Sequence, residues 1–141
     1  MATVNLLQQR TRELHLRNDM NKMGQLQLKS NFNFSVKYAP DNQRCVATVY
    51  QSFEDKSEAQ AFSVSVTLEG IFACQGMESE ADKKAVHLMA YDALFPYLQS
   101  VVGQLFASTG IPGFMVKKMN LDQNRVVLSQ GKQNPPTLPI V

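Results

Sequence analysis

The clearest pattern in the chain is an alternation of apolar and polar residues over positions 25–39. The apolar residues Leu26, Leu28, Phe32, Phe34, Val36 and Tyr38 all have even numbers, and the odd-numbered positions between them are polar. Because successive side chains of a strand point to opposite faces, this pattern predicts a strand with one apolar and one solvated face. Such strands are typical of antiparallel sheets that cover a core on one side.

Three other segments share this period of two. Leu14 and Leu16 alternate with polar neighbours and predict a first strand at about 6–18. Two more strands are expected at about 44–54 and 60–74. The apolar phase of these two strands contains Cys45, Ala47, Val49, Phe53, Phe62, Val64, Val66, Leu68 and Phe72. Short polar turns separate the segments, so the sequence predicts a four-stranded antiparallel sheet with one apolar face.

The pattern changes to a helical period at about 79–107. Ser79 followed by Asp82 is typical of a helix start, and Gly110 is typical of a helix end. On a helical wheel, one arc of roughly 140° is apolar, whereas a helix on a sheet needs about 100°. The arc contains Leu88, Tyr91, Leu94, Phe95, Leu98, Val101, Val102, Leu105 and Phe106. We therefore expect an α+β fold in which one long helix in the C-terminal half packs on the apolar face of the sheet.

The surplus apolar width of this helix favours a homo-oligomer, either a dimer or a tetramer. A helix of about 29 residues is roughly 43 Å long, which exceeds the diameter of a globule of this size. We expect a second helix face to meet another subunit. The interface candidates are Leu88, Leu98, Val102 and Leu105. A monomer with a broad core stripe is the alternative.

The domain boundary is expected near residue 122. Residues 1–122 suit one globular domain, since 44% of the 141 residues are hydrophobic. Residues 123–141 contain Pro135, Pro136 and Pro139 and are expected to be extended or disordered. No signal peptide or membrane-spanning run is visible, so we expect a cytoplasmic protein without membrane insertion.

Charge gives no indication of a nucleic-acid partner. The formal net charge is only +2. The densest basic stretch contains Arg10, Arg12, Arg17 and Lys22 and is interrupted by Glu13 and Asp19. Phosphate binding usually needs a more concentrated basic stripe, so a solvated strand face is the better interpretation.

No combination of residues predicts catalysis, a metal site or a cofactor. His15, Cys45, Cys74 and His87 lack the local pairing of a zinc site. No nucleophile elbow and no glycine-rich phosphate loop occurs. Cys45 and Cys74 could form a disulfide, although a cytosolic location favours free thiols. We expect a binding protein rather than an enzyme. An enzyme or small-ligand site would be marked by a buried His15 or His87 beside a carboxylate.

Residues 61–112 resemble the SecB family of bacterial protein-export chaperones. The resemblance rests on short motifs: Ala61-Phe62, Glu69-Gly70-Ile71-Phe72, Gly76-Met77-Glu78, Ala90-Tyr91, Leu94-Phe95-Pro96-Tyr97 and Gly110-Ile111-Pro112. It implies dimers of dimers that hold unfolded polypeptides in apolar grooves without ATP and keep preproteins competent for export. It also implies transfer of preproteins to the SecA motor.

The groove residues that we expect are Met20, Met23, Phe72, Tyr91 and Phe95. Flexible methionines suit varied partners, and aromatic side chains supply apolar area. Plain core packing is an equal alternative for the three aromatic residues.

Departures from the family pattern weigh against SecA as a partner. The acidic positions of the family's sheet face align with Glu13, Arg17 and Ser65, and only Glu13 is acidic here. The family's C-terminal helix is replaced by the proline-containing tail. A chaperone dedicated to a single client, such as an antitoxin, and not coupled to SecA is therefore the second hypothesis.

Overall fold

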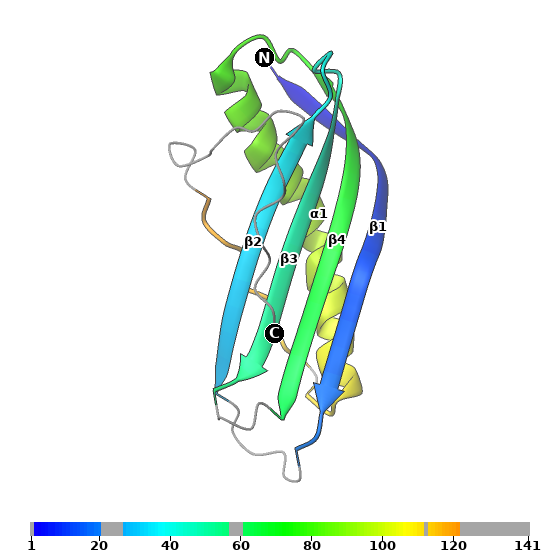
Figure 1. Ribbon diagram of the computed structural model, residues 1–141, viewed down its shortest axis with the longest axis vertical. Helices are drawn as coiled ribbons and strands as arrows, with labels where there is room; N and C mark the ends of the chain where they lie inside the picture. Colours follow the sequence, from blue (N-terminus) through cyan, green and yellow to red (C-terminus); the bar gives the residue numbers. More distant parts are fainter. Residues whose placement is uncertain (1, 21–26, 57–60, 112, 122–141) are drawn as a thin grey trace.

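The computed structural model describes residues 2–20, 27–56, 61–111 and 113–121. Four strands are followed by one helix. Their bounds are β1 Thr3–Asn18, β2 Leu28–Tyr38, β3 Arg44–Asp55, β4 Phe62–Gln75 and α1 Glu80–Ser108. The strands form one antiparallel sheet in the order β1-β4-β3-β2, so that β1 and β2 are its two edges (Figure 1).

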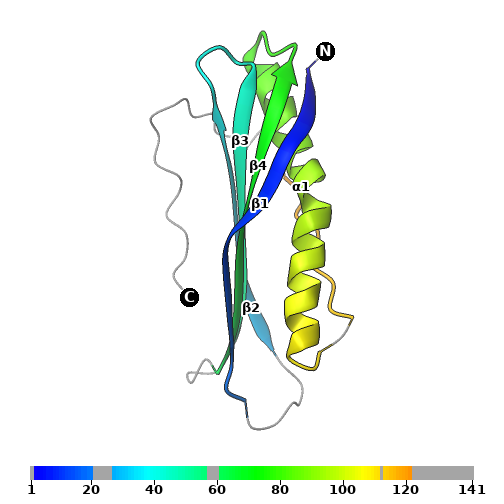
Figure 2. The same cartoon turned by 90° about the vertical axis from the view of Figure 1, so that its right-hand side faces the viewer.

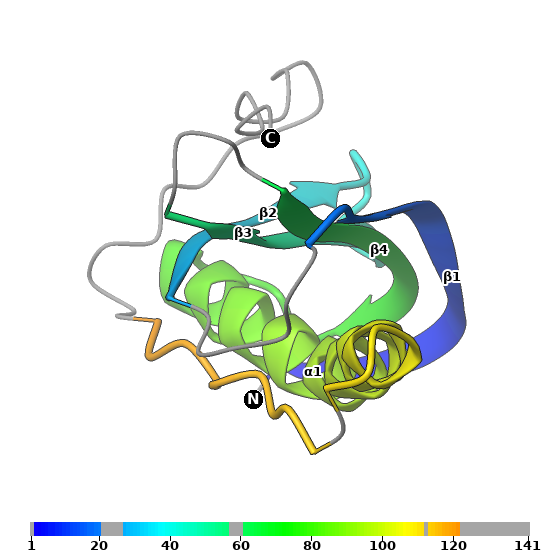
Figure 3. The ribbon, with the colours of Figure 1, turned by 90° about the horizontal axis from the view of Figure 1, so that it is seen from below.

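The strand register brings the apolar phases of neighbouring strands onto one face. Val49 lies opposite Leu68 on β4 and opposite Phe34 on β2. α1 packs across this face, and the other face carries no helix in the described part of the chain (Figures 2 and 3). The predicted α+β fold, with one long helix on the apolar side of a four-stranded sheet, is confirmed.

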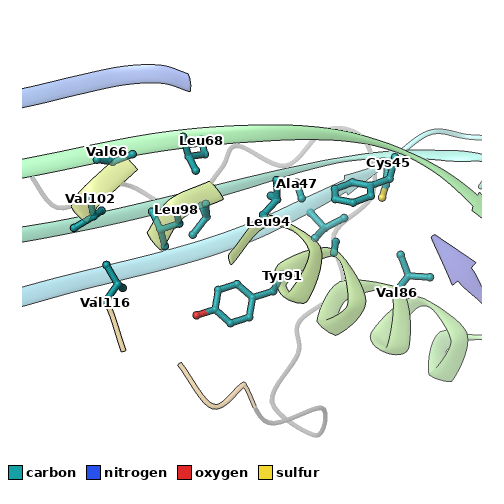
Figure 4. Close-up of a cluster of buried hydrophobic side chains, with 14 of the residues drawn as sticks. Cys45, Ala47, Val66, Leu68, Val86, Tyr91, Leu94, Leu98, Val102 and Val116 are labelled. Atoms are coloured by element: carbon teal, nitrogen blue, oxygen red, sulfur yellow. The ribbon is translucent and has the colours of Figure 1, made fainter. Parts of the chain in front are cut away.

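The core fills the layer between sheet and helix (Figure 4). Its fully enclosed side chains include Val64, Val66, Leu68 and Phe72 from β4 and Val86, Leu94, Leu98, Val102 and Phe106 from α1. Removing a side chain of the size of Val, Leu or Phe from water contributes about 1.5–3 kcal/mol. Burial between these two layers is therefore the main stabilising contribution to the fold.

Both ends of α1 match the sequence signals. The Ser79 hydroxyl accepts the backbone N–H of Asp82, and the Asp82 carboxylate accepts the N–H of Ser79. The Asp82 carboxylate also accepts the backbone N–H of Glu78 and the Ser79 hydroxyl, and these bonds, that of Glu78 first, hold the pKa of Asp82 below its ordinary value. Gly110 has a φ of 91°, a left-handed conformation that glycine adopts without strain. The helix therefore starts and stops where the sequence predicts.

β1 differs from the sequence prediction in length and in burial. It begins at Thr3 rather than near residue 6, and two register shifts bend it along β4. Leu14 and Leu16 are 54% and 42% exposed, although the alternation suggested a core face. They belong to an edge strand whose outer side has no neighbour among the described residues. The pattern had identified the strand but not its position at the edge.

Cys45 and Cys74 are free thiols buried in the core. Their sulfur atoms lie 3.4 Å apart, where the start of β3 approaches the end of β4. Burial raises the pKa of both thiols. They are therefore protonated at neutral pH and act as small packing residues.

After α1 the chain turns back along the helix as an irregular segment. We call residues 113–121 the strap. Gly113 begins it with a φ of 78°, and Val116 lies in the core. The tail expected at 123–141 lies outside the described residues.

Candidate functional site

A partly exposed apolar feature of the structure is a row of aromatic rings between the edge strand β2 and α1. We call it the β2–α1 seam, and it consists of Phe32, Phe34, His87, Tyr91 and Phe95. Tyr91 is enclosed, and the other four side chains are partly exposed. Even-numbered residues of β2 point toward the helix, and positions 87, 91 and 95 are spaced by one helical turn, so both elements place their rings in the same gap.

The rings of the seam contact one another mainly edge to face. Phe34 lies 4.9 Å from the His87 ring and 5.3 Å from the Tyr91 ring, measured between centroids. Phe32 lies 5.5 Å from Tyr91, and Phe95 lies 6.0 Å from it. Such pairs contribute about 0.5–1.5 kcal/mol beyond area burial. The seam is thus a cluster of packed rings, four of which are partly exposed.

A cavity of about 370 Å³ adjoins the seam on the strap side of α1. Leu88, Tyr91 and Asp92 form its helix wall, and residues 118–121 of the strap form the opposite wall. The Tyr91 hydroxyl oxygen accepts the backbone N–H of Met119 at 2.8 Å. Burial raises the pKa of Tyr91, so the phenol keeps its proton at neutral pH. This cavity has the size of a site for one or two side chains of a ligand.

His87 is the one basic side chain of the seam. Burial lowers its pKa from 6.5 to about 4. The imidazole is therefore neutral at pH 7 and packs against Phe34 as an aromatic ring. No ion pair joins His87 or His15 to a carboxylate among the described residues.

The lowered pKa of His87 predicts a loss of stability in mild acid. The unfolded state binds the proton at about pH 6.5 and the folded state only near pH 4, so stability falls as pH decreases between these values. At pH 5 the loss is about 1 kcal/mol after allowance for partial exposure. Urea unfolding at pH 7 and pH 5 measures it. His87→Leu is expected to remove this part of the pH dependence, and an equal slope in both proteins would contradict the assignment.

The structure places the predicted groove residues in different environments. Tyr91 and Phe95 belong to the seam, with Phe95 partly exposed. Phe72 lies in the core with no exposed surface, because it faces α1 from the middle of the sheet. Met20 is half-buried near the start of β4, away from the seam, and Met23 lies outside the described residues. In this protomer Phe72 therefore offers no surface to a client.

The predicted interface residues also differ in exposure. Leu98 and Val102 are fully buried against the sheet of their own protomer. Leu88 and Leu105 are partly exposed, and Tyr97 is 43% exposed. The wide apolar arc thus divides into a face that the sheet covers and a margin that remains accessible. Leu98 and Val102 belong to the covered face, so they present no surface to a second subunit in this conformation.

Sequence reasoning did not place Phe32, Phe34 and His87 in a site. The alternation had already assigned Phe32 and Phe34 to the apolar face of a strand. The missing fact was that β2 is an edge strand, which leaves its apolar residues half covered. The density of phenylalanine on this strand is the signal that could have identified them.

Two other kinds of feature, a metal cluster and a membrane-spanning helix, are not found in the described part of the chain. No three His, Cys, Asp or Glu side chains gather there as metal ligands. No helix of the described residues combines the length and apolarity that a membrane span needs. Apolar contact is the chemistry that the seam offers.

Comparison with known proteins gives two findings. The family model described as "Preprotein translocase subunit SecB" matches residues 13–126. A solved structure of a SecB-like chaperone from Mycobacterium tuberculosis, in complex with a ChAD peptide from the HigA1 antitoxin, is similar in fold. Its TM-score is 0.63 at 14% sequence identity, and the match covers 83% of this chain and 88% of that chain. A comparison with curated proteins finds no match.

Proposed function

Because this chain belongs to the SecB family, we propose that it is a chaperone that binds unfolded polypeptides, including preproteins, without ATP and keeps them competent for export. The observation that carries the proposal is the β2–α1 seam, where aromatic rings remain partly exposed at the edge of a sheet. Unfolded chains expose the apolar side chains that such a surface binds. We assign no catalytic step to the seam.

The edge strand β2 supports binding of extended segments. Its outer side pairs with no strand of the described residues. An extended client can form backbone hydrogen bonds with such an edge and place alternate side chains over the seam. The backbone contributes affinity without regard to sequence, which suits a chaperone with many clients.

The energetics favour weak and broad binding. About 400 Å² of apolar client surface would contribute roughly 10 kcal/mol before ordering costs. Loss of translational and conformational freedom offsets most of this gain. Clients are therefore retained and released without a nucleotide cycle.

Suppression of aggregation tests the proposal directly. We expect an equimolar amount of the protein to reduce light scattering by a chemically denatured model protein on dilution, without ATP. The same assay with ATP and Mg²⁺ should give the same result. Undiminished scattering at a tenfold excess of the protein would contradict the proposed chaperone function.

A chaperone dedicated to one client is the second candidate. The structural relative from M. tuberculosis is described in complex with an antitoxin peptide. The β1 side of the sheet also carries Arg10 and Arg12, which share Glu69 as an ion-pair partner, instead of an acidic surface. This basic character supports a role that is not coupled to SecA. Recovery of one dominant partner in a pull-down favours this version, whereas many unfolded proteins favour the general one.

We also propose a homo-oligomer, a dimer or a tetramer, that uses the β1 edge. β1 has 16 residues, and Leu7, Leu14 and Leu16 are exposed along it. Long open edges with exposed leucines are a liability unless another strand pairs with them. The partly exposed helix residues Leu88 and Leu105 would extend the contact in a tetramer. A protomer mass by light scattering at micromolar concentration would contradict this.

We propose a cytoplasmic location, where Cys45 and Cys74 would stay reduced. Cys45 and Cys74 lie within 3.4 Å of each other and are free. In an oxidising compartment such a pair tends to become a disulfide. Fractionation of cells that contain the tagged protein tests the location.

A further inference from the structure

The strap occupies a continuation of the seam along α1. Phe114 stacks on Phe106 with 3.8 Å between ring centroids and an interplanar angle of 8°. It also meets Phe53 of β3 edge to face at 5.1 Å. Val116 is buried and points into the core shared by Leu98 and Val102 (Figure 4). An extended stretch of the chain thus places alternate residues in apolar slots, as an extended client would.

The C-terminal half of the strap is held at the helix surface. The Lys118 ammonium lies 2.6 Å from the Asp92 carboxylate and 5.9 Å from the centroid of the Phe95 ring. Both side chains of the ion pair are about half exposed, so the pair contributes little to stability. The Met119 N–H donates to Tyr91. These contacts connect the strap to two residues of the seam.

The backbone of the strap is weakly fixed. Within the described residues, the bond from Met119 to Tyr91 is the one hydrogen bond that joins the strap backbone to the rest of the chain. Gly110 and Gly113 flank the start of the strap in left-handed conformations. A segment that lacks ladder hydrogen bonds opens at lower cost than a strand or a helix.

We propose that the strap is a displaceable intramolecular competitor that covers the α1 side of the seam until a client replaces it. This proposal rests on the proposed function. Opening of the strap would join the cavity beside Tyr91 to the slots of Phe114 and Val116. The groove available to a client would then extend along α1 to Phe106.

The competition lowers the apparent affinity for clients. If the open form is a fraction of the population, the apparent Kd rises by the inverse of that fraction. A strap that is open about one tenth of the time weakens binding roughly tenfold. The strap therefore favours long clients that can displace it.

Limited trypsin digestion tests displacement in the wild-type chain. Lys117 and Lys118 are cleavage sites within the strap, and the exposed Lys56 at the end of β3 is an internal reference. The probe is a synthetic apolar peptide of Phe and Leu residues, solubilised by Ser and lacking Lys and Arg. Saturating peptide is expected to accelerate cleavage after Lys117 and Lys118 at least threefold, with no change at Lys56. Fluorescence anisotropy of the labelled peptide measures its binding in parallel.

Strap variants provide the second measurement. Val116→Ser weakens the hold of the strap and is expected to tighten peptide binding about fivefold. Met115→Ser is the matched control, since Met115 is 70% exposed on the same segment and should leave the affinity unchanged. If Val116→Ser does not fold, the digestion of the wild-type chain alone tests whether a client displaces the strap.

The outcomes separate the two proposals. Peptide binding with unchanged cleavage after Lys117 and Lys118 overturns the strap proposal alone. Peptide binding by Val116→Ser and not by wild type supports it. Absence of binding by wild type and variants overturns the proposed function and the strap proposal together.

Discussion

Replacing Gly70 by valine is expected to lower the free energy of unfolding by about 3 kcal/mol, or to prevent folding. Gly70 lies in β4, and the Leu94 side chain of α1 packs directly over it. A Cβ atom there would lie 2.8 Å from Leu94 Cδ2, 2.9 Å from Phe72 Cε1 and 3.3 Å from Leu6 Cδ1. The first two distances are shorter than real contacts, and both side chains are fully buried, so Leu94 and Phe72 would have to shift within a packed core. Urea unfolding followed by circular dichroism measures the loss.

Gly103→Ala is the matched control for that substitution. A Cβ atom at Gly103 would lie 3.8 Å from the Phe114 carbonyl oxygen, an ordinary contact. Since alanine favours a helix interior by about 1 kcal/mol over glycine, this variant is expected to be as stable as wild type or more stable. Equal destabilisation by both substitutions would refute the close approach at Gly70.

The double substitution Phe32→Ser and Phe95→Ser is expected to weaken binding of unfolded clients about 30-fold. Each ring is partly exposed in the seam and is therefore accessible to a ligand. Loss of two such rings removes about 2 kcal/mol of contact energy. Titration of a labelled, reduced and carboxymethylated model protein gives the affinity by fluorescence anisotropy.

Tyr97→Ser is the matched control for the seam substitutions. Tyr97 lies two positions from Phe95 and is 43% exposed, but it has no ring contact with the seam. Its loss is expected to leave client affinity within a factor of two. Urea midpoints of all three proteins verify that folding is intact. Unaltered affinity in the double variant would remove the seam as the client site.

The fold was predictable because its signals are local. Alternation along β2, β3 and β4 marked the buried face, and Phe62, Val64 and Val66 are all enclosed as expected. The capping box of Ser79 and Asp82 marked the start of α1. Each signal depends on the backbone geometry of one element, which the sequence of that element encodes directly.

The site was harder to predict because it depends on which elements are neighbours. The helical wheel gave the apolar arc of α1 but not the part that the sheet covers. Leu98 and Val102 were therefore expected at an interface, whereas the structure places them in the core. Phe32 and Phe34 are partly exposed only because β2 is the last strand of the sheet, and a periodic pattern contains no information about strand order.

The strand order also determines when the protein can assemble during its own synthesis. Thr3 pairs with Gln75 and Asn18 with Phe62, so the first strand to leave the ribosome finds its neighbour only after the fourth has emerged. Until then the leucines of β1 face water without a partner strand. A nascent chain of this protein is thus itself a candidate client, and completed copies nearby would be the first to protect it.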